Sequence, residues 1–512
     1  MGGMSSAVVE GSPVSLRIMN PATGALVAEV PAAVPADVAP AMARARRAQA
    51  AWARLSFRTR GALLRRLAGR ILRDPELTNT LIAENGKPRY EAEAIEVFYT
   101  CELTRFLTGR TGRRALRDDV RHPFVFANKR ARVVYHPHGV IAVIGPWNWP
   151  LLNNYADCVA PLAAGNAVIL KPSPITPLTS LRVAELWRDE GLPEDVLQVL
   201  PGAADVGAAL CDEADMVFFT GSQAGGRKVA VRCAERLVPC ALELGGKSPF
   251  IVLRDADLAT AARAAVWGAF ANSGQVCIRP ERVLVEEPAA AAFIEHCQTE
   301  LARLRQGPDD GGHPDTADID VGAITVPAQV ERVEAQLADA VAKGARVLSG
   351  GKRRAIGGGR FFEPSLVVDV TPAMAMAREE TFGPVLPILR VRDEDEAVAL
   401  ANGTGLGLSG SVWSRDVVRA RAIARRLQAG SVCVNDVLVN YFCVEAPLGG
   451  VKGSGLGLRH GPESLRQACR VETVIEDHPL LGFLSGPINR QLAFPYKTKV
   501  LKLLRWIMRR LY

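Results

Sequence analysis

The chain has 512 residues, of which 48% are hydrophobic and 23% are charged, and its formal net charge is +8. This length exceeds what one hydrophobic core organises, so we expect two or more domains, and the composition is that of a soluble globular protein. Ten cysteines and seven histidines are scattered without the spacing of a disulfide framework or a zinc site. The cysteine pattern therefore indicates a reducing cytoplasm and no metal.

The N-terminal part reads as a leader followed by short strands and helices. Residues up to Val14 have the composition of a disordered leader, although Met1-Gly2 with Ser6 also matches a minimal myristoylation pattern. From Pro35 to Lys87 the pattern is helical, with a break at Pro75. The arginine-rich helix faces lack interleaved aromatic residues, so they indicate solvated surfaces rather than a nucleic-acid site.

A central block alternates short apolar runs with helical segments, which predicts a parallel α/β sheet covered on both faces. The expected strands are Val140 to Ile144, Asn166 to Leu170, Val196 to Leu200, and Met216 to Phe219. Such sheets bind ligands at the carboxyl ends of their strands. The glycines from Gly221 to Gly226 do not form the G-x-G-x-x-G fingerprint, so they indicate either a phosphate site or a simple turn.

Two more regions show strand patterns. Phe124 to His136 alternates as a half-exposed strand does. A second α/β block has expected strands at Phe250 to Leu253, Arg282 to Val285, and Arg346 to Leu348, and a helix from Asp255 to Ala271. The acidic stretch from Gly311 to Asp320 reads as an exposed loop.

Three side chains form a candidate catalytic set. Cys277 follows a Gly-Gln turn, which suits a nucleophile, although a buried cysteine is the commoner case. Glu243 lies between leucines, where its pKa could rise towards the working pH of a base, or it could cap a turn. Asn148 lies in a rigid Pro-Trp-Asn-Trp-Pro turn, as an oxyanion donor or as a structural amide.

The chain resembles the aldehyde dehydrogenase superfamily from about Met19 to about Glu476. Six motifs carry the resemblance, in the family's order. They are Pro146-Trp147-Asn148, Lys171-Pro172-Ser173, Phe219-Thr220-Gly221-Ser222, Glu243-Leu244-Gly245-Gly246-Lys247, Gly274-Gln275-Val276-Cys277 and Glu380-Thr381-Phe382-Gly383-Pro384-Val385.

The resemblance implies an α/β fold of three parts: a Rossmann-like parallel-sheet cofactor domain, an α/β catalytic domain and a small β oligomerisation arm. The expected ranges are 15–121 and 141–247 for the dinucleotide-binding domain, 248–434 for the catalytic domain, 122–140 and 465–477 for the oligomerisation strands, and 478–512 for a C-terminal tail. Arg470 to Ile475 would pair with the arm strand, and the protein would be a homodimer or homotetramer.

The resemblance also implies an oxidoreductase that converts an aldehyde to a free carboxylic acid with NAD or NADP. Cys277 would form a thiohemiacetal and then a thioester, Asn148 would hold the oxyanion, and Glu243 would activate water. The implied cofactor residues are Trp147, Lys171, Ser173, Gly221, Ser222, Gly226, Leu244, Glu380 and Phe382. Pro174 replaces the glutamate of many NAD-preferring members, so the preference between NAD and NADP is open.

Trp149, Asn153 and Arg279 are expected to line the substrate tunnel by their position relative to the motifs. Arg279 would either pair with an anionic substrate, such as succinic semialdehyde, or form a structural salt bridge. The segment from Arg459 to Glu463 resembles a branch named for succinate semialdehyde. Leu448 departs from the family's usual phenylalanine, which weakens inference about the inner end of the tunnel.

The tail from His478 to Tyr512 carries seven basic residues and no acidic one. Read as a helix, residues 497–512 place apolar side chains on one face and basic ones around the other, with Trp506 among them. This pattern suits either peripheral contact with an anionic membrane, and then a long-chain aldehyde substrate, or packing against protein. A non-catalytic cofactor-binding or structural protein is the alternative of a different class.

Overall fold

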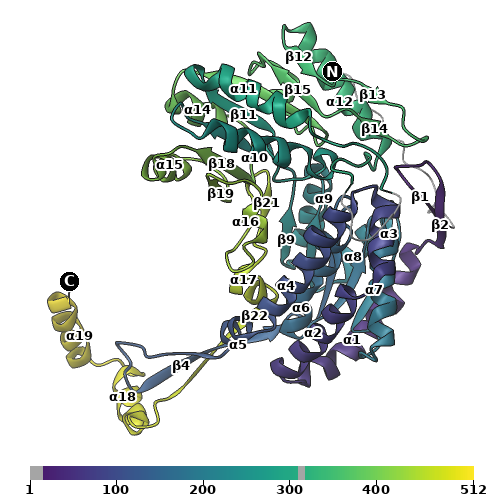
Figure 1. The fold of residues 1–512 in the computed structure, drawn as a ribbon. Helices are drawn as coiled ribbons and strands as arrows, with labels where there is room; N and C mark the ends of the chain where they lie inside the picture. Colours follow the sequence, from purple (N-terminus) through teal and green to yellow (C-terminus); the bar gives the residue numbers. More distant parts are fainter. Residues whose placement is uncertain (1–14, 310–317, 512) are drawn as a thin grey trace.

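A computed structural model describes residues 15–309 and 318–511. Two α/β units and a narrow β arm make up the molecule (Figure 1). The leader up to Val14, with its myristoylation pattern, lies outside the described residues, as does most of the loop from Gly311 to Asp320. The first described elements are β1 (Ser15–Met19) and β2 (Leu26–Pro31), an antiparallel pair joined by a turn in which Gly24 has φ 74°.

The first unit is built on a six-stranded sheet in the order β21-β9-β8-β5-β6-β7, in which every pairing is parallel except that of β21 with β9. Its strands are β5 (Val140–Ile144), β6 (Ala167–Lys171), β7 (Leu197–Val199), β8 (Met216–Thr220), β9 (Cys240–Glu243) and β21 (Gly455–Leu456). All residues of β5 and β6 are buried. Their unbroken apolar runs follow from the cover of helices on both faces.

Helices cover this sheet. They are α1 (Val38–Arg54), α2 (Phe57–Leu72), α3 (Pro75–Asn85), α4 (Phe98–Leu107), α5 (Arg110–Ala115), α6 (Ala156–Ala164), α7 (Leu178–Asp189), α8 (Ala204–Glu213), α9 (Gln223–Glu235) and α17 (Gly461–Gln467). The region expected to be helical up to Lys87 breaks at Ser56 as well as at Pro75. Ser56 caps α2 by accepting the Thr59 N–H at 3.1 Å.

The second unit is built on a seven-stranded sheet in the order β12-β15-β16-β11-β10-β18-β19. Its strands are β10 (Pro249–Val252), β11 (Arg282–Glu286), β12 (Arg346–Ser349), β15 (Ser365–Val368), β16 (Val385–Val391), β18 (Ser409–Trp413) and β19 (Ser431–Val434). The accompanying helices are α10 (Leu258–Phe270), α11 (Glu287–Leu301), α12 (Pro327–Ala342), α13 (Ala375–Arg378), α14 (Glu394–Asn402) and α15 (Val417–Ala424). The helix expected from Asp255 begins three residues later because Asp257 is its N-cap and accepts the Thr260 N–H.

The arm is a three-stranded antiparallel sheet in the order β22-β4-β3. Its strands are β3 (Asp119–Arg121), β4 (Lys129–Pro137) and β22 (Cys469–Asp477). Two boundaries differ from the expectation. The strand expected from Phe124 begins at Lys129, because the Lys129 N–H closes a turn on the Phe126 carbonyl at 2.8 Å. Asp119 to Arg121, expected in the cofactor unit, pairs with β4 instead.

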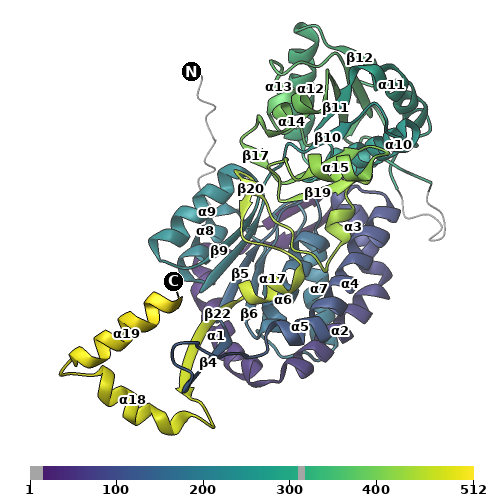
Figure 2. The same ribbon diagram turned by 90° about the vertical axis from the view of Figure 1, so that its left-hand side faces the viewer.

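Beyond the arm, the chain continues as α18 (Ser485–Leu492) and α19 (Thr498–Leu511). Figure 1 shows these two helices past the far end of β4 and β22, away from both large sheets, and Figure 2 shows the same tail from the side. Ser485 ties α18 to the arm, since its hydroxyl donates to Asp477 and accepts from the Asn128 amide. No described residue of α19 is buried.

Candidate active site

Cys277 follows a strained turn at the carboxyl end of α10, the one-turn helix η4 (Ala271–Gly274). Asn272, Ser273 and Gly274 have φ values of 47°, 54° and 75°, so three consecutive residues adopt the left-handed conformation. A Cβ on Gly274 would lie 2.2 Å from the Gly383 carbonyl oxygen, so only glycine fits there. The turn is held from outside: the Asn272 N–H donates to Glu91 and the Ser273 hydroxyl donates to the Gly322 carbonyl, each at 2.8 Å. Such over-determined strain is typical of functional sites.

The thiol of Cys277 lies where two cavities meet. Cys277 lines both an apolar chamber and a second cavity that opens towards the ends of β8 and β9, and Asn153 is the other residue common to the two. Burial, together with the nearby carboxyl groups of Glu243 and Glu380, raises the pKa of Cys277 to about 12. The thiol is therefore accessible from two sides and is neutral at pH 7 in the cofactor-free protein.

Asn148 follows β5 and is fixed through both its side chain and its backbone. One amide hydrogen on Nδ2 donates to the Gln275 carbonyl at 2.9 Å, beside the nucleophile turn. The Asn148 carbonyl accepts from Lys87 Nζ at 3.1 Å and from the Asn272 amide at 2.7 Å. Because an amide carries two N–H groups, Asn148 keeps one for an oxyanion beside Cys277, and both residues line the same cavity.

Glu243 is the last residue of β9 and lines that same cavity. Burial raises its pKa to about 8, while the charge of Arg459 lowers the pKa and that of Asp157 raises it. Its Oε1 accepts no hydrogen bond from any described residue. A carboxyl group that is buried, unpaired and half-ionised near pH 8 is suited to take a proton from water.

The second cavity, of about 180 Å³, has the features of a nicotinamide-nucleotide site. Among the expected cofactor residues, its lining includes Trp147, Gly221, Ser222, Leu244, Glu380 and Phe382. Glycine permits two close approaches: a Cβ on Gly245 would lie 2.5 Å from Glu380, and one on Gly226 would lie 2.4 Å from Leu244. Ser222 caps α9 at the carboxyl edge of the sheet, where a pyrophosphate is favoured. The residues present therefore fit the cofactor.

Three of the expected cofactor residues do not line this cavity. Gly226 is covered by Leu244, and Ser173 is buried with its hydroxyl accepting the Ile175 N–H at 3.3 Å. The Lys171 ammonium donates to the carbonyls of Pro172 and Gly202 at 2.9 and 3.0 Å, and burial lowers its pKa to about 8. Pro174 lies beside these residues, so no carboxylate occupies its position.

The side chain of Arg279 does not line the apolar chamber beside Cys277. Its guanidinium is fully buried, pairs with Glu281 at 2.8 Å and donates to the carbonyls of Ala269, Gly383 and Val385. Of the two alternatives for this residue, the structure has the salt bridge. The reason is Glu281, which also pairs with Lys247 and accepts the backbone N–H groups of residues 381 and 382.

The apolar chamber on the other side of Cys277 contains Trp149 and Asn153 as expected. The remaining lining residues are almost all hydrocarbon: Ile95, Leu152, Trp267, Ala271, Val276, Ile278, Leu438, Tyr441 and Phe442. None of the described residues that line it is charged. Tyr441 donates its hydroxyl to the Asn153 amide oxygen at 2.7 Å, so the two polar groups satisfy each other.

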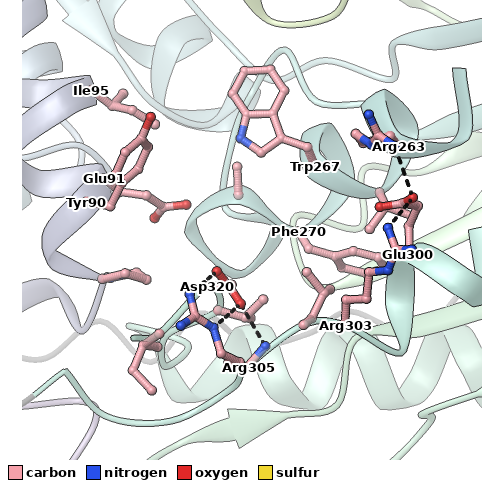
Figure 3. Close-up of a pocket in the computed structure, with 16 residues that line it drawn as sticks. Tyr90, Glu91, Ile95, Arg263, Trp267, Phe270, Glu300, Arg303, Arg305 and Asp320 are labelled. Atoms are coloured by element: carbon pink, nitrogen blue, oxygen red, sulfur yellow. Dashed lines mark hydrogen bonds and ion pairs between the residues drawn. The ribbon is translucent and has the colours of Figure 1, made fainter. Parts of the chain in front are cut away.

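A larger outer cavity, of about 550 Å³, adjoins the apolar chamber, and the two share Ile95, Trp267 and Ala271. Figure 3 shows Tyr90 and Ile95 on one side of it and Trp267 and Phe270 towards the other. Most of its charged groups pair with one another: Arg305 with Asp320 at 2.9 Å, and Arg303 and Arg263 with Glu300 at 3.0 and 3.6 Å. Glu91 is the exception, since it accepts the Asn272 N–H but its buried Oε2 accepts no hydrogen bond from a described residue.

Several residues of the site lie outside any recognisable sequence motif. Lys87 and Glu96 form a buried ion pair that holds the loop around Asn148, and Glu96 also accepts the backbone N–H groups of Leu151 and Leu152. The available signal was the density of charged residues between Glu84 and Glu96. Asp157 and Arg459 gave no signal, because their contact joins positions far apart in the sequence.

Within residues 15–309 and 318–511, no group of three histidine, cysteine, aspartate or glutamate side chains is arranged to hold a metal ion. No helix in the described part of the chain combines the length and apolarity needed to cross a bilayer.

A parallel-sheet nucleotide site lies next to a half-buried cysteine, an amide donor and a carboxyl base. This combination defines a nicotinamide-dependent oxidoreductase that works through a covalent thiol adduct. The family model described as "Aldehyde dehydrogenase family" matches residues 8–474. The chain belongs to the aldehyde dehydrogenase family. Known relatives include a "Putative succinate-semialdehyde dehydrogenase [NADP(+)] 2" from Mycobacterium bovis, 38% identical over 88% of this chain and 86% of the relative.

Other relatives have different names. A 4,4'-diapolycopene aldehyde oxidase from Methylomonas sp. is also 38% identical, over 88% of this chain and 84% of its own length. The crystal structure of succinate-semialdehyde dehydrogenase from Burkholderia pseudomallei has a TM-score of 0.86 at 35% identity, covering 91% of this chain and 95% of that one. The expected α/β fold and NAD(P)-dependent aldehyde oxidation are thereby confirmed.

Proposed function

We propose that this aldehyde dehydrogenase oxidises apolar aldehydes, longer than the inner chamber, to free carboxylic acids. The observation that carries the proposal is the lining of the chamber beside Cys277, in which no described residue is charged. A four-carbon semialdehyde would place its carboxylate there without a cation, and an unpaired buried charge is strongly disfavoured. The names of several relatives favour succinate semialdehyde as the second candidate.

The outer cavity supports a long substrate. The inner chamber and the outer cavity share three lining residues, which supports a substrate whose chain extends from Cys277 through the chamber into the outer cavity. Burial of each additional CH₂ contributes about 0.8 kcal/mol. Binding should therefore tighten with chain length until the chain reaches the paired charges of Arg303 and Arg305.

The geometry supports the following catalytic roles. The Cys277 thiol releases its proton to solvent as its sulfur bonds to the carbonyl carbon, and the resulting oxyanion accepts from the free Asn148 N–H and from the Cys277 backbone N–H. Bound NAD(P)⁺ supplies the acceptor for the hydride that leaves this carbon, which becomes a thioester. Glu243 then takes a proton from water as the water oxygen bonds to the thioester carbon, and the thiolate leaves with the C–S electron pair.

For the cofactor, we propose that both NAD and NADP are accepted. The support is Pro174, since a glutamate there would repel the 2′-phosphate, and Lys171, whose ammonium lies buried nearby at the end of β6. Trp147 and Phe382, whose rings meet edge to face with centroids 5.6 Å apart, would flank the cofactor on the Cys277 side.

For the assembly, we propose a homodimer or homotetramer formed through the arm. The support for the assembly is the outer strand β22, on which Val471 and Ile475 are 60% and 67% exposed.

We also propose peripheral contact of α19 with an anionic membrane surface in the cytoplasm. The support for membrane contact is the exposed apolar face of α19 beside its basic residues. A membrane would also be the source of long apolar aldehydes.

The test is the formation of NAD(P)H over linear aldehydes from three to sixteen carbons and succinic semialdehyde, with each cofactor. We expect kcat/KM to rise with chain length and to be lowest for the semialdehyde. Leu304→Asp should lower kcat/KM for long aldehydes about tenfold and leave propanal unchanged, because Leu304 lines the outer cavity and not the inner chamber. Val231→Asp, on exposed α9, is the matched control. A preference for the semialdehyde would overturn the proposal.

A further inference from the structure

Asp157 and Arg459 form a buried ion pair that the reaction scheme above does not use. Asp157 lies on α6, and Arg459 lies between β21 and α17. Arg459 Nε is 3.0 Å from Asp157 Oδ1, and the two side chains are 6% and 9% exposed. The guanidinium lies over the ring of Phe218, 4.5 Å from its centroid. Removing both charges from water costs free energy, so a contribution to stability does not by itself explain why this pair is buried.

Several polar atoms of Arg459 and Glu243 have no hydrogen-bond partner among the described residues. Neither Nη of Arg459 donates a hydrogen bond to a described residue, and Oε1 of Glu243 accepts none. All of these atoms are buried. Buried polar groups are nearly always hydrogen-bonded, so unmatched donors beside an unmatched carboxylate oxygen indicate a contact made during the reaction.

The sheet brings these groups together. Gly455 of β21 and Thr220 of β8 are the residues that pair with Glu243 from either side. The Thr220 hydroxyl donates to Asp157 Oδ2 at 3.3 Å, which ties Asp157 to the strand beside Glu243. Arg459 follows β21 closely, and its backbone exchanges two hydrogen bonds with Leu448. Asp157 and Arg459 are thus both anchored to the strands that flank the base.

We propose that the Asp157–Arg459 pair positions Glu243 for thioester hydrolysis. The free Nη groups of Arg459 hold the Glu243 carboxylate in the orientation from which it takes the proton of the attacking water, and Asp157 fixes the guanidinium. This inference rests on the proposed role of Glu243 as the base. Arg459 stays protonated throughout, so the proton that Glu243 takes from water passes to solvent after the thiolate has left.

The two members of the pair should affect hydrolysis with opposite signs. The ionisable groups that act on Glu243 are Arg459, Asp157, Cys277 and Tyr441, the last from α16 (Val439–Phe442). Burial raises the pKa of Cys277 to about 12 and that of Tyr441 well above its ordinary value, so both are neutral near pH 8. Arg459 lowers the pKa of Glu243 and Asp157 raises it.

The experiment measures the burst of NAD(P)H and the later steady state by stopped flow, from pH 6 to 10, in full-length Arg459→Met, Arg459→Lys and Asp157→Asn enzymes. We expect Arg459→Met to keep its burst, to turn over about tenfold more slowly, and to move the pH midpoint of hydrolysis upward. Asp157→Asn should move that midpoint downward. Arg459→Lys keeps the charge and should restore most of the midpoint.

The double variant Asp157→Asn with Arg459→Met removes both charges and leaves neither one unpaired, so it tests the pair if a single variant fails to fold. Its midpoint should lie between those of the single variants. Equal loss of burst and turnover with an unchanged midpoint would mean a merely structural pair and would overturn the inference. Glu243→Gln separates the two proposals: if it hydrolyses the thioester normally, the base assignment itself fails.

Discussion

Burial keeps the thiol of Cys277 and the carboxyl of Glu243 largely protonated at pH 7, with pKa values raised to about 12 and about 8. The two groups also line one cavity, and ionisation of Glu243 raises the pKa of Cys277. We therefore expect the nucleophile of the cofactor-free protein to react slowly with oxidants and alkylating reagents, because thiolates and not thiols react.

The first prediction concerns this reactivity. In the cofactor-free enzyme, alkylation of Cys277 by iodoacetamide should accelerate about tenfold per pH unit between pH 7 and pH 10, because the thiolate fraction rises in proportion below the pKa. Mass spectrometry of the Cys277 peptide measures the rate. Cys443, which is exposed, serves as the internal control for reagent access. A Cys277 rate that levels off below pH 8 would contradict the prediction.

A second prediction at this scale concerns Pro174. Pro174→Glu should lower kcat/KM with NADP about tenfold or more and leave that with NAD nearly unchanged, since a carboxylate repels the 2′-phosphate but binds a ribose diol. Steady-state kinetics with both cofactors give the ratio. Ile175→Glu, at the adjacent and 37% exposed position, controls for the added charge. Equal loss with both cofactors would place Pro174 away from the ribose.

At the scale of elements, a buried ion-pair hub joins three segments around the nucleophile. Glu281 accepts from Lys247 after β9, from Arg279 after Cys277, and from the backbone at Thr381 before β16. Burial alone would raise the pKa of Glu281, but Arg279 and Lys247 outweigh it and hold the pKa at about 2. Of its two expected roles, Arg279 therefore has the structural one, and it helps to fix the walls of the site.

Glu281→Gln should therefore lower the free energy of unfolding by about 3–5 kcal/mol, because it leaves two buried cations without their partner. Urea unfolding at pH 7 measures the loss. Glu287→Gln, which removes an exposed pair with Arg390, should cost about 0–1 kcal/mol. Since the folded pKa is depressed, the stabilisation is present above the ordinary glutamate pKa and is lost as pH falls towards 2. A similar small loss in both variants would contradict the hub.

The contrast between Cys277 and Arg279 shows what could be predicted from the sequence. Local patterns identified the strand from Val140 to Ile144 and the turn before Cys277, because unbroken apolar runs and glycines act over neighbouring residues. Side-chain partners depend on contacts between distant segments. The sequence around Glu281 and Arg459 therefore did not indicate their ion-pair partners. For the same reason it did not show whether Arg279 faces a substrate or forms a salt bridge.

At the scale of the whole molecule, the arm and its tail lie away from both large sheets (Figures 1 and 2). Both expose apolar side chains. On α19, Leu503, Ile507 and Leu511 are 55%, 37% and 51% exposed, and Lys502 and Arg509 lie among them in the sequence. A partner subunit would cover such a face through apolar contact alone. An anionic bilayer would use both faces, since the basic residues attract its headgroups and the apolar ones enter its boundary.

Flotation with liposomes containing phosphatidylserine distinguishes these cases. We expect the full chain to bind them, a chain ending at Asp477 not to bind, and both to keep turnover with short aldehydes. Lys502→Glu with Arg509→Glu should weaken binding and its dependence on salt, because each basic residue near the surface contributes about 1 kcal/mol that salt screens. Leu503→Glu with Ile507→Glu should abolish binding at every salt concentration. If only the apolar variant loses its subunit assembly and no form binds liposomes, the helix contacts protein, and long aldehydes must reach the outer cavity from solution.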